Sequence, residues 1–233
     1  MIFFDIDGTL VDFKQAEAAG VRAFQLTHRR LFPSPAESFY ADWCLAGARH
    51  YSRFLQGELT FEQQQAERVK ELFAQADTPL TDQEAGEYFL TYLQAFEASW
   101  AAYDDVVPCL RLLREQGHTL GIISNGNGAQ QRSKLERTGI HAYFPLIVIS
   151  SEAGAAKPGA AIFEAACRHA ERSPGDCLYI GDDLDTDILG CQRAGMRGIW
   201  LNRNGISTEH PVPAIRSLAE LVWIAGSGPD FKR

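Results

Sequence analysis

The sequence lacks the patterns that mark thiolate-metal, membrane-spanning and nucleic-acid-binding proteins. Its five cysteines include no CxxC pair and no other metal-ligand spacing. No apolar run approaches the roughly 20 residues that cross a bilayer, and the basic and apolar regions of a signal peptide are missing. Lysine and arginine form no runs, and the formal net charge is −8. We therefore expect no nucleic-acid polymer and no membrane as a partner.

The composition that remains is that of a packed globular protein. The odd number of cysteines fits reduced thiols used for packing, which favours a cytoplasmic location. With 233 residues, 45% of them hydrophobic, the chain is long enough for one full-sized domain and a smaller one. Because the chain is acidic overall, an anionic ligand would have to be held by local positive charge. The sequence carries no signal for an oligomeric state.

Short apolar runs alternate with helical stretches along much of the chain. Five of these runs predict buried strands, at residues 2–6, 119–124, 146–149, 177–180 and 198–201. Short buried strands separated by helices are typical of a parallel sheet that is covered on both faces. We therefore predict an α/β fold with a doubly wound, mainly parallel sheet.

The first two predicted strands are separated by more than a hundred residues, far more than one crossover helix needs. Two capping boxes, Thr60 with Gln63 and Thr81 with Glu84, predict helix starts within this stretch. Apolar residues recur behind them at helical spacing, at positions 69, 72, 73 and 76 and at 89, 92, 93, 96 and 100. We predict an all-helical insertion at residues 13–104, a core domain from residues 1–12 and 105–233, and a frayed tail at 226–233.

Two carboxylates lie at the end of the first predicted strand, in Asp5-Ile6-Asp7-Gly8-Thr9, which comes directly after the apolar residues 2–4. The period of two along a strand would point Asp5 and Asp7 to the same side. Two acids this close repel each other and are costly to desolvate unless a cation, a proton or solvent compensates. The segment is therefore a candidate for chemistry, and the alternative is a simple turn formed by Asp and Gly.

Polar residues also follow the other predicted strands. Ser124 and Asn125 either cap the next helix or offer donors to an anion. Lys157 is either a surface lysine or the cation of a shaped loop between small residues and Pro158. The acids after the fourth strand, Asp182, Asp183, Asp185 and Asp187, include helix caps. Acids from two strands that meet at one sheet edge nevertheless suggest a hard cation with oxygen ligands, most economically Mg²⁺.

The order of these motifs resembles the haloacid dehalogenase superfamily, whose phosphatases use an aspartate nucleophile. The resemblance implies a Rossmann-like core and a helical cap domain of the C1 type, inserted after the first motif. More narrowly, residues 135–139, 148–152 and 187–190 are similar to the branch that contains pyrimidine 5'-nucleotidases. Position 183 is Asp where that branch has Thr, which leaves the substrate open.

The resemblance also implies a role for each polar residue. Asp5 is expected to attack phosphorus, and Asp7 is expected to protonate the leaving group and then activate water. Asp5, the backbone carbonyl of Asp7, and Asp182 are the expected Mg²⁺ ligands. Asp183 and Asp187 are expected to contact these ligands and not the ion itself. The phosphoryl oxygens are expected to contact Ser124, the amide of Asn125, and Lys157.

The expected activity is Mg²⁺-dependent hydrolysis of a small phosphorylated metabolite, with pyrimidine nucleoside 5'-monophosphates as one candidate. Alternatives are a phosphatase for a sugar phosphate or phosphoglycolate, a sugar phosphomutase, a 2-haloacid dehalogenase and a non-catalytic phosphoacceptor domain. Dehalogenation needs no acid for its leaving group, so Asp7 argues against it. The insertion contains rings that either stack on the leaving group or pack in its core, and packing is favoured for each: Phe13, Trp43, His50, Tyr51 and Phe54. We expect His50 to have no partner that would make it a base.

Overall fold

The computed structural model describes residues 1–221, so the predicted frayed tail lies outside the described residues. The chain divides into two compact units. The core unit consists of Met1–Asp12 and the chain from Ala101 onward, and the helical insertion is Phe13–Trp100. The core resumes at Ala101, four residues before the position that the sequence suggested, because Ala102 already pairs with Val11 in a β-bridge.

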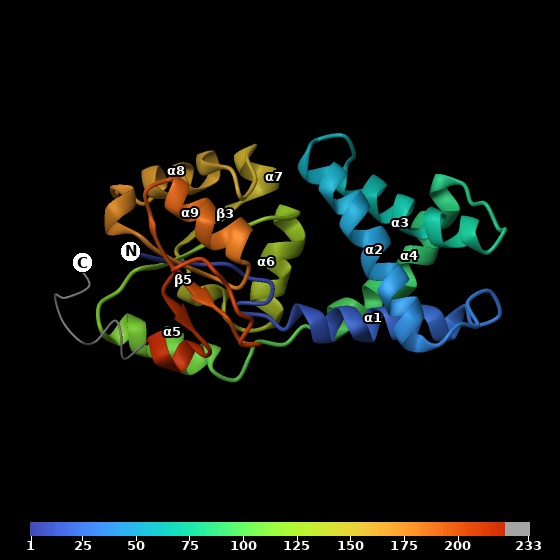
Figure 1. Cartoon of the computed structure of the whole chain (residues 1–233), viewed down its shortest axis with the longest axis horizontal. Helices are drawn as coiled ribbons and strands as arrows, with labels where there is room; N and C mark the ends of the chain where they lie inside the picture. The colour runs from blue at the N-terminus through green and yellow to red at the C-terminus, as the bar shows by residue number, and fades with distance from the viewer. Residues whose placement is uncertain (222–233) are drawn as a thin grey trace. The chain divides into compact units, whose positions relative to one another are not determined.

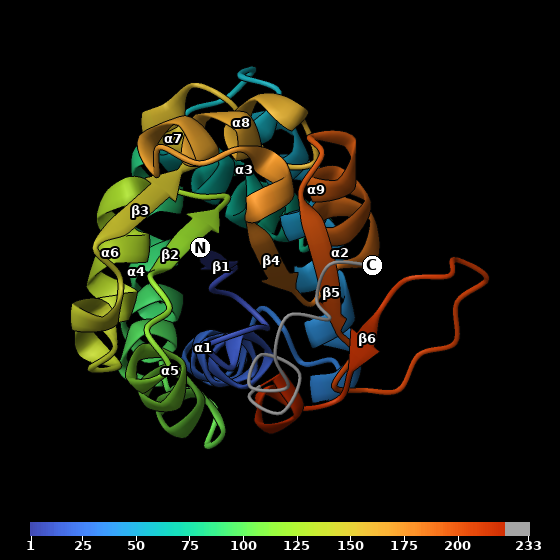
Figure 2. The same cartoon turned by 90° about the vertical axis from the view of Figure 1, so that its left-hand side faces the viewer.

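The core unit contains a six-stranded sheet in which all paired neighbours are parallel. Its order is β3-β2-β1-β4-β5-β6, and Figures 1 and 2 show it with helices on both faces. The strands are β1 (Ile2–Phe4), β2 (Leu120–Ser124), β3 (Leu146–Ile149), β4 (Leu178–Gly181), β5 (Arg197–Leu201) and β6 (Ala214–Ile215). The prediction of a doubly wound parallel sheet is confirmed.

Alternate residues of β1 belong to opposite faces of the sheet. Ile2 and Phe4 lie in a buried cluster with side chains of α5 (Val106–Glu115) and α6 (Gly128–Arg137). Phe3 lies in another cluster with side chains of α8 (Ala160–His169) and α9 (Gly190–Arg193). Between these helices the chain forms the short α7 (Ser150–Ala153) and a π-helix (Leu184–Leu189). Burial of apolar side chains on both faces explains why the strands read as continuous hydrophobic runs.

The sheet differs from the prediction at two strands. A sixth strand, β6, pairs with β5 through only two residues, too few for a recognisable alternation. The second difference is that β1 ends at Phe4, two residues before the end of the predicted strand at residue 6. Asp5 and Asp7 therefore lie beyond the strand, and the period of two does not set their directions.

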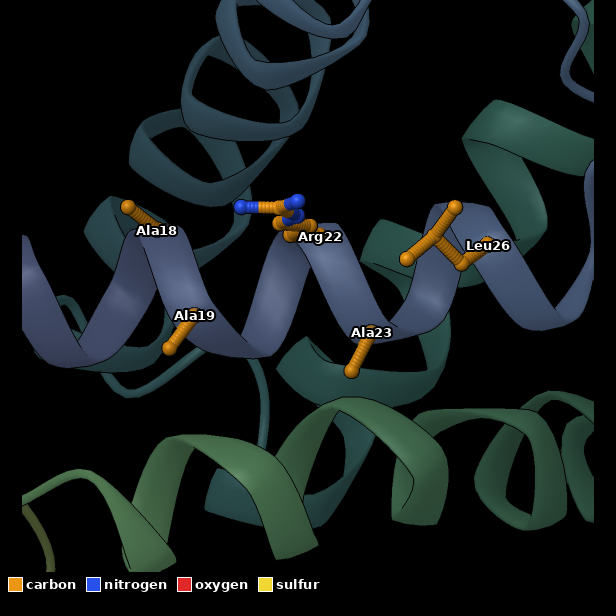
Figure 3. A pocket seen from close by; sticks show the side chains of 5 residues that line it. All are labelled: Ala18, Ala19, Arg22, Ala23 and Leu26. Carbon is orange, nitrogen blue, oxygen red and sulfur yellow. The ribbon is translucent and has the colours of Figure 1, made fainter.

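The helical insertion contains α1 (Phe13–Thr27), α2 (Ala36–Leu55), α3 (Phe61–Gln75) and α4 (Asp82–Ala98). Both predicted capping boxes are present, at the starts of α3 and α4. Within the described residues, no helix is long and apolar enough to cross a membrane. On the outer side of α1, small side chains beside Arg22 and Leu26 leave a shallow depression (Figure 3).

The core of the helical insertion is strongly aromatic. Trp43 has no exposed surface and packs against Tyr92, with ring centroids 4.6 Å apart. Packing is thus the role the structure gives Trp43, and Phe13 packs edge-on against Phe96. The expectation for His50 was wrong, because its Nε2 lies 2.8 Å from Oε2 of Glu71. That partner was invisible in the sequence because it comes from another helix, α3.

Candidate active site at the end of β1 and β4

The strand order creates a switch point between β1 and β4. From β1 the chain continues to β2 and β3 on one side, then returns to place β4 on the other side of β1. In open α/β sheets, ligands bind outside the carboxyl ends of the strands at such a point. Asp5 follows β1 and Asp182 follows β4, so the fold brings these two acids to the same place.

Three carboxylates converge there. One oxygen from each of Asp5, Asp182 and Asp187 lies within 4.8 Å of the other two. Two glycines make room for this approach. A Cβ at Gly181 would lie 2.2 Å from Oδ2 of Asp187, and a Cβ at Gly8, whose φ is +81°, would lie 2.2 Å from Oδ2 of Asp182. The site therefore requires residues without side chains at both positions.

Lys157 is the cation that faces these acids. Its Nζ donates to Oδ1 of Asp5 and to Oδ1 of Asp187, each at 2.7 Å. It also donates to the hydroxyl of Tyr179 at 3.0 Å, and that hydroxyl donates to the carbonyl of Ile123 at 2.9 Å. Lys157 is only 4% exposed, so the interpretation of this residue as a surface lysine is wrong.

The electrostatics of the cluster reflect burial and crowding. Burial raises the pKa of Asp5 to about 6, with Lys157 opposing the rise and Asp187 and Asp7 adding to it. Burial, followed by repulsion from Asp5 and Asp187, raises the pKa of Asp182 to about 8. Burial alone would lower the pKa of Lys157, but Asp187 and Asp5 hold it above its ordinary value. One ammonium therefore does not compensate the three acids.

The uncompensated charge fits a divalent cation. With the three acids ionised and Lys157 protonated, the cluster carries a net charge of −2. Carboxylate oxygens are the ligands that hard cations such as Mg²⁺ take. Two oxygens bound to Mg²⁺ at about 2.1 Å lie at most about 4.2 Å apart. Small side-chain adjustments would bring these oxygens to that distance.

Asp7 lies in a different environment from Asp5. Its Oδ1 accepts from Nζ of Lys134 at 2.5 Å, and its Oδ2 accepts from Nε2 of Gln131 at 2.9 Å. We expected the two aspartates to point to the same side, but their carboxylates bind different lysines: Asp5 binds Lys157 and Asp7 binds Lys134. Sequence analysis missed Lys134 and Gln131. The only available signal was a pair of polar residues three apart on one face of α6, which is ordinary for an exposed helix.

The last residue of β2, Ser124, and the residue after it, Asn125, are held in place by their neighbours. Ser124 is buried, and its Oγ accepts from Nε2 of Gln131 at 2.9 Å. The side chain of Asn125 binds the backbone of Lys157 at both ends, accepting from its amide at 2.8 Å and donating to its carbonyl at 2.9 Å. Asn125 thus fixes the loop that carries Lys157.

Asp182 and Asp183, in the loop after β4, make further hydrogen bonds that set their positions. Asp183 is a helix cap, since its Oδ1 accepts from the amide of Thr186 at 2.7 Å, and it does not belong to the three-carboxylate cluster. Asp182 accepts from the hydroxyl of Thr9 at 3.2 Å. Its backbone carbonyl accepts from the indole of Trp200 at 2.8 Å. The acid cluster is therefore held both by the segment that follows β1 and by β5.

The family model for haloacid dehalogenase-like hydrolases matches residues 1–195. The chain belongs to this family. Two curated relatives that align with almost all of this haloacid dehalogenase-like hydrolase are both named as enzymes that act on phosphate esters. Human N-acylneuraminate-9-phosphatase is 30% identical over 246 residues, covering 94% of this chain and 91% of its own length. Pyrimidine 5'-nucleotidase YjjG from Escherichia coli K12 is 31% identical over 230 residues, covering 95% and 96%.

Solved structures of the family share the fold. The crystal structure of the HAD-hydrolase YfnB from Bacillus subtilis, bound to magnesium, is 25% identical to this haloacid dehalogenase-like hydrolase. The two match with a TM-score of 0.80, and the match covers 97% of each chain. The resemblance inferred from the motifs is therefore confirmed, and so is the fold class of a Rossmann-like core with a helical insertion.

Proposed function

We propose that this phosphoric monoester hydrolase acts on a small phosphorylated metabolite through an aspartyl-phosphate at Asp5, with Mg²⁺ as its cofactor. The observation that carries the proposal is the cluster of Asp5, Asp182 and Asp187 oxygens within 4.8 Å, with the buried Lys157 against it. Such a cluster is expensive to bury, and it lies at the switch point where α/β sheets bind ligands.

In the proposed reaction, an oxygen of Asp5 forms a bond to phosphorus while the bond from phosphorus to the leaving oxygen breaks. Asp7 gives its proton to that oxygen. A water oxygen then forms a bond to the phosphorus of the aspartyl-phosphate while the bond from Asp5 to phosphorus breaks. Asp7 takes a proton from this water, so inorganic phosphate, the Asp5 carboxylate and protonated Asp7 result. Asp7 lies beside the nucleophile but outside the three-carboxylate cluster, as two separate tasks require.

A phosphate dianion must approach several carboxylates in this site. Each repulsion at about 4 Å amounts to roughly 4 kcal/mol at an effective dielectric near 20. Lys157, the hydroxyl of Ser124 and the amide of Asn125 are the proposed partners of the phosphoryl oxygens. When bound, Mg²⁺ supplies positive charge that offsets the rest of this repulsion. Asp5, Asp182 and the backbone carbonyl of Asp7 are the proposed ligands.

Asp187 and Asp183 are proposed to support these ligands rather than bind the ion themselves. Both oxygens of Asp187 already accept hydrogen bonds, Oδ1 from Lys157 and Oδ2 from the amide of Asp183 at 3.1 Å. Asp183 caps the π-helix. On the carboxylate of Asp182, in contrast, the only hydrogen bond from the described part of the chain is that of the Thr9 hydroxyl, which leaves lone pairs for a cation.

The substrate remains a choice among small phosphomonoesters. Relatives that match over nearly the full length include a pyrimidine 5'-nucleotidase and an N-acylneuraminate-9-phosphatase. Both a pyrimidine nucleoside 5'-monophosphate and a phosphorylated sugar acid are therefore candidates. Sugar phosphates and phosphoglycolate complete the panel that should be assayed.

The test is phosphate release across this panel with Mg²⁺ and with EDTA. We expect release from at least one substrate, loss of release in EDTA and recovery when Mg²⁺ is restored. Asp182→Asn should weaken the response to Mg²⁺, whereas Asp185→Asn, at an exposed acid of the same loop, should leave it unchanged. Metal-independent release, or none from any substrate, would contradict the proposal.

Product analysis separates the competing activities on the same scaffold. A phosphomutase would return an isomeric phosphate ester when supplied with a bisphosphate, and a dehalogenase would release halide from a 2-haloacid. A phosphoacceptor domain would hold phosphate on Asp5 for many minutes, whereas a phosphatase turns it over rapidly. Asp7 is held by two buried side chains, which supports a reaction that transfers a proton to the leaving group.

A further inference from the structure

We propose that Lys134 and Gln131 are positioning residues that fix the Asp7 carboxyl group as the proton donor to the leaving oxygen. The inference rests on the proposed function, in which Asp7 is the general acid. It assigns a task to two buried polar side chains that the proposed reaction leaves unexplained.

Both side chains come from α6 and lie three residues apart, so they share one face of the helix. That face is buried, with Lys134 1% exposed and Gln131 2% exposed. Lys134 binds Oδ1 of Asp7 at 2.5 Å and Gln131 binds Oδ2 at 2.9 Å. One helix therefore holds both oxygens of the carboxyl group.

The orientation of the Gln131 amide is set by Lys134. An ammonium group can only donate hydrogen bonds, so Oε1 of Gln131, which lies 2.7 Å from Nζ of Lys134, must be the side that faces it. The NH₂ group is thereby directed to the opposite side. There its two hydrogens are shared among three acceptors, Oδ2 of Asp7, Oγ of Ser124 at 2.9 Å and the carbonyl of Asn125 at 3.1 Å.

The network therefore ties the proposed acid to the proposed phosphate-binding loop. With one donor on each oxygen, rotation of the Asp7 carboxyl group would break two hydrogen bonds. The Asp7 side chain is nevertheless 29% exposed, so one edge of the group stays open. A protonated carboxyl group retains acceptor capacity beside its O–H, so the network is compatible with a proton on Asp7. A general acid must lie within hydrogen-bond reach of its target, and this network limits where Asp7 can point.

Burial of Lys134 supports a functional reading of the network. An ammonium group inside a protein is unfavourable unless it is paired, and an apolar side chain at this position would pack without that penalty. The anion that compensates Lys134 is Asp7, which the proposed chemistry itself requires. In the proposed reaction, this pair therefore joins a buried cation to the acid that exchanges protons with the substrate.

The dependence of rate on the leaving group tests this inference. 4-Nitrophenolate departs readily without a proton, whereas an alkoxide needs one. We expect Lys134→Met to lower kcat/KM for an alkyl phosphate about 100-fold, the lower range of general acid catalysis, and for 4-nitrophenyl phosphate less than about 5-fold. Because kcat/KM ends at the first irreversible step, it reports departure of the leaving group and not the later attack of water. Gln131→Leu should show the same pattern.

The controls separate positioning from loss of structure. Asp7→Asn gives the full leaving-group effect, and Lys134→Arg should restore most of the rate for the alkyl phosphate. Arg132→Met is the matched control, because Arg132 is a cation of the same helix that binds Glu152 at the surface. It should leave the ratio of the two rates unchanged, and circular dichroism should show that each variant is folded.

Two results distinguish failure of this inference from failure of the proposed function. Equal losses for both phosphates in Lys134→Met and Gln131→Leu, with a strong leaving-group effect in Asp7→Asn, would overturn the positioning role alone. Absence of phosphatase activity in the wild-type protein, or a leaving-group effect missing from Asp7→Asn, would instead overturn the proposed function on which it rests.

Discussion

Removal of divalent cations should make the thermal stability of this protein depend on pH. The pKa of Asp182 is raised from 3.8 to about 8 in the folded chain, chiefly by burial and then by Asp5 and Asp187. Between these two values the folded state binds a proton that the unfolded chain has already released. The metal-free protein therefore loses stability as the pH rises from about 4 to about 8.

The magnitude follows from the geometry of the cluster. A shift of about 4 pKa units sets an upper limit of roughly 6 kcal/mol, at about 1.4 kcal/mol for each unit. A single repulsion over 4.8 Å gives about 3.5 kcal/mol at an effective dielectric near 20. Asp182 faces two carboxylates, and Lys157 offsets about one of them. We therefore expect a loss of about 3 kcal/mol between pH 5 and pH 8, which is roughly 10 °C in Tm for a chain of this size.

Calorimetric melts in EDTA at several pH values, repeated with Mg²⁺, measure this loss. Mg²⁺ should raise Tm most at pH 8, because the ion binds the ionised carboxylates. Asp182→Asn should flatten the dependence on pH in EDTA, and Asp185→Asn, at an exposed acid, should not. A Tm in EDTA that stays constant from pH 5 to pH 8, or that Mg²⁺ does not raise at pH 8, would refute the reasoning.

Three further substitutions test other parts of the site. Asp5→Asn should lower kcat by at least about 10⁴-fold in a phosphate-release assay, without lowering Tm; a loss of less than about 10-fold would exclude Asp5 as nucleophile. Lys157→Met leaves two buried carboxylates without their cation, so urea titration should show a loss of at least about 3 kcal/mol; unchanged stability would contradict the buried ion pairs. Gly8→Ala displaces Asp182 and should weaken Mg²⁺ binding about 10- to 100-fold by titration calorimetry. Gly57→Ala, with similar φ but open space, should leave that affinity unchanged.

Much of the site follows from the sequence because its parts lie at strand ends. Buried parallel strands appear as apolar runs, and their carboxyl ends meet at one edge of the sheet. That Asp5 and Asp182 follow different strands and meet at one edge of the sheet could therefore be expected before the structure, and so could the polar residues at the end of β2 and after β3. The two capping boxes of the helical insertion were equally local, since each depends on residues only three apart.

The parts that could not be predicted depend on contacts across the fold. Lys134 is 127 residues from Asp7 along the chain, and nothing in α6 distinguishes a buried lysine from an exposed one. Likewise, the pairing of His50 with Glu71 joins two helices whose relative rotation is set by packing. The strand β6 exists because β5 offers it a free edge, which no short-range pattern encodes.

The paired segments at the base of the helical insertion have a consequence for how the chain can vary. Val11 and Ala102 form an antiparallel bridge, and the amide of Asp12 donates to the carbonyl of Ala101 at 3.0 Å. The segment that enters the insertion and the segment that returns from it are thus hydrogen-bonded to each other. A single hairpin turn could connect them. We therefore expect the core unit to tolerate exchange or shortening of the insertion between Asp12 and Ala101.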